Sequence, residues 1–259
     1  MPAQTCLLTV EGPHDTEFVA RLLKPMGFSR IQSWPALPEY WRAIVPQKFP
    51  VGSDLLGRHP VPTFFHKATG ETIAVRSANG ISKIITSLSD ELSQLSAVPE
   101  AIGIVLDADQ EQHPADRYVD LCEEWAAKSN NGLVTFPALA GQVNAGPPKA
   151  GVFILPDNVH PGTLENILIQ AAALNYPNAL TAAQAYIAGF PTPDLQQEDL
   201  GGFNAPAGHN KATVAAIASI LKPGKAIQVS IQDNRWLAAA AMQLPDVQRV
   251  STFLVDLLG

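Results

Sequence analysis

The chain has 259 residues, which is enough for one large domain with a sizeable hydrophobic core. It carries 17 Lys and Arg against 24 Asp and Glu, a formal net charge of −7, and only 16% of its residues are charged. These values exclude collagen-like, coiled-coil and miniprotein classes, and they disfavour a protein that grips duplex phosphates through a broad basic surface.

The cysteine content and the first residues predict a cytoplasmic protein. Cys6 and Cys122 are too few for a disulfide framework and have no zinc-like spacing. No segment reaches the ~18 apolar residues of a membrane span. Charged residues, among them Glu11 and Glu17, interrupt the region where a signal peptide would be apolar. We therefore expect no membrane partner.

Three short apolar runs predict the buried strands of a parallel sheet. They occupy residues 6–10, 102–106 and 151–155, and they lack the period-2 alternation of half-exposed strands. Apolar residues at helical spacing follow each run, over about 14–26, from Pro114 onward, and over 162–174. Three such repeats of strand and helix predict an α/β fold with right-handed crossovers.

The other segments complete a single predicted domain over 1–259. Residues 33–66 are rich in proline, and we expect an irregular insertion there. A strand over 72–76 and an amphipathic helix over 80–96 follow. Residues 162–259 are expected to be mainly helical, with helices over 162–174, 178–189, 209–221, 233–243 and 246–258. Their proline and glycine content predicts a loop over 190–208.

Carboxylates follow the ends of the three apolar runs. The residues concerned are Glu11, Asp107, Asp109 and Asp157. Ligands of open parallel sheets bind outside the carboxyl ends of the strands. Like charges that gather there need a compensating cation, and Mg²⁺ prefers one or two carboxylates together with waters and phosphate oxygens. The pattern therefore predicts a Mg²⁺ or Mn²⁺ site, in which Asp107 and Asp109 point in the same direction from an extended chain.

A structural interpretation competes with metal binding at these residues and at two further acidic residues, Asp15 and Glu165. An acidic residue after a strand commonly caps the following helix, and Asp15 in the first turn of a helix favours the helix dipole. Asp157 before Asn158 is typical of a turn with its own hydrogen bonds. Glu165 follows Thr163 by two residues instead of three, so a capping box there is imperfect. Both interpretations stay open at this stage.

The aromatic residues of the insertion allow two interpretations as well. They could stack on the bases of a single-stranded nucleic acid, or they could hold the insertion on the core. Few basic residues are interleaved with them, which favours the core. The residues are Trp34, Tyr40, Trp41, Phe64 and Phe65.

Two motifs resemble the Toprim domain that topoisomerases, bacterial primases and the overcoming-lysogenization-defect (OLD) nucleases share. They are Val10-Glu11-Gly12-Pro13-His14-Asp15 before a helix and, further along the chain, Leu106-Asp107-Ala108-Asp109. The later Leu155-Pro156-Asp157-Asn158, Gly162-Thr163-Leu164-Glu165 and a basic residue near 211 resemble a small Toprim-related family, domain of unknown function 3226. The resemblance covers roughly residues 5–258 and implies a Toprim-like, mostly parallel sheet flanked by helices.

The resemblance implies a metal-dependent phosphoryl-transfer enzyme, most often a nuclease that acts on a nucleic-acid phosphodiester. Glu11 would be a metal ligand or a general acid or base, and Asp107 and Asp109 would hold the same ion. Lys211 would stabilise the transition state. A second ion would take its ligands from the remaining carboxylates, Asp15, Asp157 and Glu165.

Departures from the Toprim pattern keep a second class of function open. The segment between Glu11 and Asp107 is long, and the chain has no Walker motif, zinc ribbon or topoisomerase tyrosine context, so neither a primase nor a topoisomerase is expected. The alternative is a non-catalytic Toprim-like regulator that binds a nucleic acid, a nucleotide or a protein. A homo-oligomer or a protein partner stays open for both classes.

Overall fold

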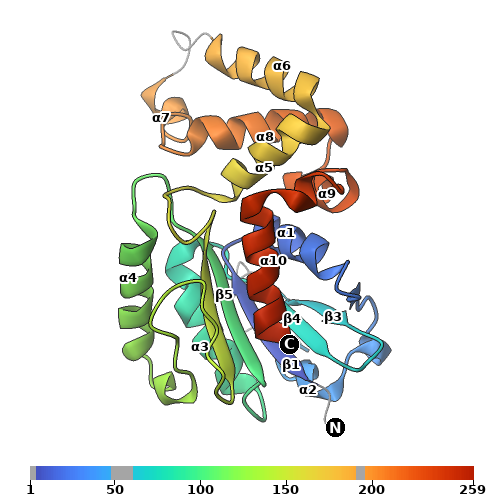
Figure 1. The fold of residues 1–259 in the computed structure, drawn as a ribbon, viewed down its shortest axis with the longest axis vertical. Coiled ribbons are helices and arrows are strands. Elements are labelled where there is room, and N and C mark those ends of the chain that lie inside the picture. The colour runs from blue at the N-terminus through green and yellow to red at the C-terminus, as the bar shows by residue number, and fades with distance from the viewer. Residues whose placement is uncertain (1–3, 48–60, 191–195) are drawn as a thin grey trace. The chain divides into compact units, whose positions relative to one another are not determined.

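The computed structural model describes residues 4–47, 61–190 and 196–259 (Figure 1). The chain is organised in two compact units. The first, here the sheet unit, comprises Met1–Leu106, Tyr118–Phe153 and Phe253–Gly259. The second, here the helical unit, comprises Asp107–Arg117 and Ile154–Thr252. The single domain expected over 1–259 stays a prediction.

A mixed sheet with mostly parallel strands forms the centre of the sheet unit. Its order is β2-β3-β4-β1-β5-β6. The central strand β1 runs parallel to β4 and β5, whereas β2 and β3 join antiparallel at one edge. This arrangement confirms the predicted α/β fold. The strands are β1 (Thr5–Val10), β2 (Ser29–Arg30), β3 (Thr63–His66), β4 (Thr72–Ser77), β5 (Ala101–Asp107) and β6 (Lys149–Leu155).

Burial on both faces explains why the strands lack alternation. Every residue of β5 is buried, and so is every residue of β1 after Thr5. Within the sheet unit, α3 (Ile84–Gln94) and most of α4 (Pro114–Ala126) lie on one face of the sheet, and α1 (Pro13–Leu23) and the last turns of α10 (Pro245–Leu258) lie on the other (Figure 1). The expected helices over 14–26, 80–96 and 246–258, and the helix from Pro114, are thus confirmed.

The prediction of an irregular insertion over 33–66 is wrong at its C-terminal end. Residues 63–66 form β3, in which Phe64 and Phe65 are buried opposite Ala74 and Ile73 of β4. Two large apolar side chains that reach the core favour strand pairing over a loop. Short helical segments lie earlier in the insertion, at Trp34–Ala36 and in α2 (Glu39–Arg42). Residues 48–60 lie outside the described residues.

Trp41 shows that aromatic residues hold this segment on the core. Its side chain is fully buried, and its Nε1 donates a hydrogen bond to Oγ1 of Thr72 over 2.9 Å. Phe64 and Phe65 are buried as well, whereas Trp34 is exposed. The core interpretation therefore holds for Trp41, Phe64 and Phe65.

The helical unit contains most of the helices that follow β6. Helices α5, α6 and α8 pack on one another, and α9 packs on α8. They confirm that residues 162–259 are mainly helical. None of the helices in the described ranges combines the length and apolar character that crossing a membrane requires. The helices are α5 (Leu164–Asn175), α6 (Pro177–Ala188), α7 (Gln197–Leu200), α8 (Gly208–Leu221) and α9 (Ile227–Asp233).

The predicted helix over 233–243 is wrong. Helix α9 ends at Asp233, and only a 3-10 turn at Ala241–Gln243 follows before α10. The reason is Trp236, which is fully buried and donates through Nε1 to Oγ of Ser230 over 2.9 Å. The chain must turn back after α9 to make this contact. The predicted loop over 190–208 contains α7, and its residues 191–195 lie outside the described residues.

A buried ion pair in the sheet unit makes stability depend on pH. Glu91 of α3 is 3% exposed, and its Oε1 lies 3.0 Å from Nη1 of Arg76 on β4. Burial raises the pKa of Glu91 from 4.5 to about 7; Arg76 opposes this rise and Asp90 adds to it. The folded protein therefore holds a proton on Glu91 in a pH range where the unfolded chain has lost it.

We predict that the free energy of unfolding falls as pH rises from 4.5 to about 7 because of Glu91. The folded state binds more protons in this window, and one group contributes a slope of at most about 1.4 kcal/mol per pH unit. Glu91→Gln should flatten the profile, measured by urea unfolding across the window. The matched control is Glu124→Gln, on the exposed face of α4. An unchanged slope in Glu91→Gln would contradict the assignment.

Candidate functional site

The predicted site residues are divided between the two units. Glu11 and Asp15 belong to the sheet unit, where Oδ2 of Asp15 accepts the backbone N–H of Gly12 over 2.8 Å at the start of α1. The helical unit contains the others: Asp107, Asp109, Asp157, Glu165 and Lys211. The arrangement of this second group can be described from contacts within one unit.

Asp107 caps a helix. It is the last residue of β5, it is buried, and its Oδ1 accepts the backbone N–H of Leu164 over 2.8 Å. Leu164 is the first residue of α5, so the carboxylate satisfies one of the N–H groups that a helix leaves unpaired at its start. Asp107 therefore caps a helix, as the structural interpretation expects. The capped helix is α5, however, and not α4, the helix that follows Asp107 in the chain.

Asp109 adopts a backbone conformation that is rare outside glycine. Its φ is 67°, and β5 ends at Asp107, so the extended alternation expected for the pair does not reach Asp109. The backbone N–H of Gly162 donates to its carbonyl over 2.8 Å, and Nη2 of Arg117 lies 2.6 Å from its Oδ2. A left-handed residue costs about 1–2 kcal/mol, which these contacts offset.

Asp157 forms a turn with its own hydrogen bonds. Its Oδ1 accepts the backbone N–H groups of Val159 and His160, over 3.0 and 2.8 Å. Its Oδ2 lies 2.7 Å from Nδ1 of His160 and 3.5 Å from Nη1 of Arg249. Burial raises the pKa of Asp157, but hydrogen bonds from His160 and Val159 outweigh it and leave the pKa below its ordinary value. Both oxygens are engaged, which favours the structural interpretation.

Glu165 is a buried carboxylate in the first turn of α5. The capping partner of Thr163 is Asn166, whose Oδ1 accepts the backbone N–H of Thr163 over 2.9 Å, so Glu165 is not used as a cap. Glu165 is only 7% exposed to solvent. Within the described ranges, its buried Oε2 has no hydrogen-bond partner. Such an atom is costly unless it is paired, which makes it a ready ligand for a cation.

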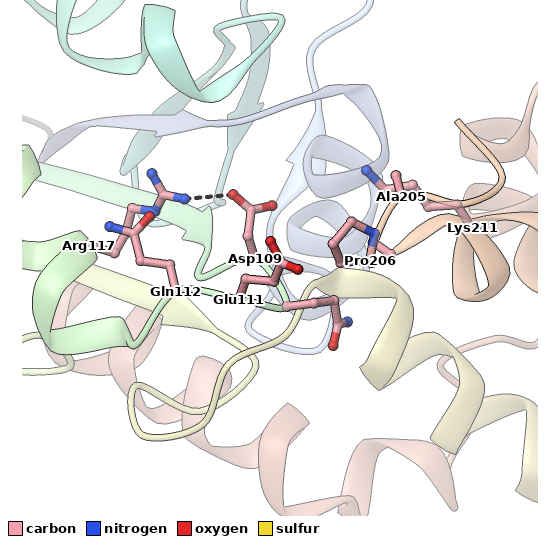
Figure 2. Close-up of a pocket in the computed structure, with 9 residues that line it drawn as sticks. Asp109, Glu111, Gln112, Arg117, Ala205, Pro206 and Lys211 are labelled. Carbon is pink, nitrogen blue, oxygen red and sulfur yellow. Dashed lines mark hydrogen bonds and ion pairs between the residues drawn. The ribbon is translucent and has the colours of Figure 1, made fainter. Parts of the chain in front are cut away.

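A pocket of about 390 Å³ contains Asp109 and Lys211 in its lining. Figure 2 shows Asp109 and its ion pair with Arg117 on one side and Lys211, from α8, on the other. The segment that leads into α8 also lines the pocket, so the positive end of that helix lies at its wall. The remaining lining residues are Gln110, Glu111, Gln112, Ala205, Pro206 and Ala207.

Sequence reasoning missed Arg117. It lies in the first turn of α4, where a basic side chain is unfavourable for the helix dipole. A basic residue in that position, shortly after an Asp-x-Asp pair, is the sequence signal that could have predicted an ion pair between Arg117 and one of these aspartates. Glu111 of the same pocket was missed too, and it offers no comparable signal.

A metal site here would rest on few protein ligands. Across 4–47, 61–190 and 196–259, no group of three or more His, Cys, Asp or Glu residues is arranged to hold an ion. Mg²⁺ is commonly bound through one or two carboxylates, retained waters and substrate phosphates. Asp107 accepts an N–H from the first turn of α5, and Glu165, whose Oε2 has no hydrogen-bond partner in the described residues, belongs to the same turn, so these two carboxylates are the candidates for such a site.

Comparisons with known proteins place the chain in a family and a fold. A family described as "Protein of unknown function (DUF3226)" matches residues 5–259. Hypothetical protein PH0156 from Pyrococcus horikoshii OT3, known from its crystal structure, is 18% identical with a TM-score of 0.52, over 98% of this chain and 95% of that one. At this identity the likeness shows the fold alone. No curated protein matches, and the Toprim relation stays a prediction.

We predict that Gly208→Ala distorts the pocket wall. A Cβ at Gly208 would lie 2.2 Å from the carbonyl oxygen of Phe203 and 2.4 Å from that of Gly202, so the backbone at the start of α8 must shift. Overpacking of this kind costs about 1–3 kcal/mol. Thermal unfolding should show a lower midpoint, while Gly202→Ala, whose Cβ meets nothing within 4 Å, is the control. Equal midpoints for the two variants would contradict this packing.

Proposed function

We propose that this chain, which belongs to the family "Protein of unknown function (DUF3226)", is a metal-dependent phosphoryl-transfer enzyme, in its simplest form a nuclease. The observation that carries the proposal is the Glu165 carboxylate, which is more than nine-tenths buried and has an oxygen without a hydrogen-bond partner in the described part of the chain. It lies in the same helical turn that the Asp107 carboxylate caps. Two carboxylates brought to one helix end favour a divalent cation between them.

Asp107 and Glu165 would hold Mg²⁺ or Mn²⁺. Both are hard oxygen donors, and the polar first turn of α5 fits such an ion. A bound ion of this kind supplies Lewis-acid polarisation of a phosphoryl oxygen. Glu11 and Asp15 stay predicted ligands, and Asp157 is left out because its own turn engages both of its oxygens.

The pocket beside this helix end would hold the phosphate group of the substrate. Lys211 is exposed at the pocket and carries a positive charge that would offset charge on the phosphoryl oxygens during transfer. Asp109 is about half exposed, so its carboxylate is accessible from the pocket. Lys211 is therefore the proposed transition-state stabiliser.

One observation favours the second candidate function, a non-catalytic regulator. The Asp109 carboxylate already has a counter-ion, because Arg117 lies 2.6 Å from it. A protein in which Asp109 stays paired with Arg117 would bind an ion at Glu165 and a nucleotide, nucleic acid or protein elsewhere, and it would catalyse no phosphoryl transfer. Ion binding without cleavage of any DNA or RNA would support this candidate.

We predict that Glu165→Gln lowers Mn²⁺-dependent cleavage of labelled single-stranded DNA or RNA by at least about 100-fold, because it removes a charge that would hold the ion. Gel analysis of the products provides the measurement, and circular dichroism checks the fold of each variant. Glu198→Gln, at an exposed carboxylate of α7, should cleave normally. Full activity in Glu165→Gln would refute the assignment.

A further inference from the structure

We infer that four aromatic side chains of the helical unit, here the aromatic row, form a base-stacking surface for single-stranded nucleic acid. The members of the aromatic row are Tyr186, Phe190, Phe203 and His209. The inference deepens the proposed function and rests on it in one respect, since the bound strand would be the substrate that enters the neighbouring pocket. It names a class of substrate that the carboxylates alone do not define.

The four rings contact one another in turn, from the end of α6 to the start of α8. The ring centroids of Tyr186 and Phe190 lie 5.6 Å apart, edge to face. Those of Phe190 and Phe203 lie 6.5 Å apart. Those of Phe203 and His209 lie only 4.4 Å apart, with their planes at 34°. The end of α6 and the start of α8 lie on the same side of the helical unit (Figure 1), so the rings form one continuous row.

The aromatic row is open to solvent. Tyr186 is 59% exposed, His209 is exposed, and Phe190 and Phe203 between them are partly exposed. Aromatic side chains that hold this fold together, such as Trp236, are fully buried. An exposed group of large apolar side chains indicates an interaction site. Tyr186 and His209, at the two ends, therefore offer ring surface to a ligand.

The aromatic row leads to the pocket that the proposed function assigns to the phosphate. Ala205–Ala207 line this pocket and lie between Phe203 and His209 in the chain. Gly208 keeps the segment compact, because a Cβ there would meet the carbonyl oxygen of Phe203. Lys211, two residues beyond His209, lines the pocket as well. A strand whose base stacks on His209 therefore has a positive side chain close by for a phosphate.

The charge around the aromatic row favours a single strand over a duplex. Residues 162–210 contain no Lys or Arg, and α7, between Phe190 and Phe203 in the chain, adds two carboxylates. A duplex keeps its bases stacked on one another and is bound through its phosphates by clustered cations. Unpaired bases instead stack on aromatic rings, largely without regard to sequence. A row of rings with one neighbouring lysine suits the second kind of ligand.

The test is fluorescence anisotropy of the full chain with a fluorescein-labelled single-stranded DNA of about 12 nucleotides, a length within the usual site sizes. EDTA prevents metal-dependent cleavage during the titration. We expect Tyr186→Ala and His209→Ala each to weaken binding at least about 5-fold, because a stacked base contributes at least about this factor. Tyr186→Phe keeps the ring and should bind like the wild type. The control is Ile220→Ala, at an exposed apolar residue in the last turn of α8, which should change nothing.

Salt and a duplex competitor give a second readout. We assign one phosphate contact, to Lys211, so the logarithm of the binding constant should fall with the logarithm of the salt concentration with a slope no steeper than about −0.7. The same sequence as a duplex should bind at least about 10-fold more weakly, because it offers no unstacked bases. A slope several times steeper, or equal binding of the duplex, would show that phosphates dominate binding and would overturn the inference.

The remaining outcomes separate the aromatic row from the proposed enzyme. Absence of binding by the wild type, or unchanged binding in Tyr186→Ala and His209→Ala, overturns the aromatic row and leaves the enzyme proposal standing. Ring-dependent binding in EDTA without cleavage in Mn²⁺ supports the aromatic row and overturns the enzyme. Sedimentation that shows self-association of the wild type, lost in Tyr186→Ala, would mean that a second copy covers the rings, which also overturns the inference.

Discussion

Buried negative charge at the start of α5 is the constraint on which the proposed site depends. Asp107 and Glu165 come from segments far apart in the sequence, and both are buried beside the first turn of one helix. The helix offers an N–H to Asp107 but leaves an oxygen of Glu165 without a hydrogen bond in the described residues. Burying such an oxygen without a partner is costly, and a cation bound as we propose would offset that cost.

Around this helix end, backbone and side-chain contacts work together. The left-handed conformation of Asp109 allows its carbonyl to pair with Gly162, next to the cap of α5, while its carboxylate reaches Arg117. Local strain of this kind is often retained where a site requires it. The same few residues therefore connect the proposed ion site to the proposed phosphate pocket within the helical unit.

The sequence predicted what depends on local pattern and missed what depends on distant contacts. Continuous apolar runs identified β1, β5 and β6 because burial on both faces removes alternation. The helix expected over 233–243 failed because Trp236 folds back onto Ser230, a contact that periodicity does not encode. Candidate residues were found as carboxylates at strand ends, yet their partners, Leu164 for Asp107 and Arg117 for Asp109, follow only from the folded chain.

The most direct measurement is an anomalous-difference map from a crystal soaked in Mn²⁺. The account predicts a peak about 2.1 Å from a carboxylate oxygen of Glu165, with Asp107 facing the same ion. A hydrogen-bond donor of the protein or an ordered water on Oε2 of Glu165, with no anomalous peak beside α5, would contradict it.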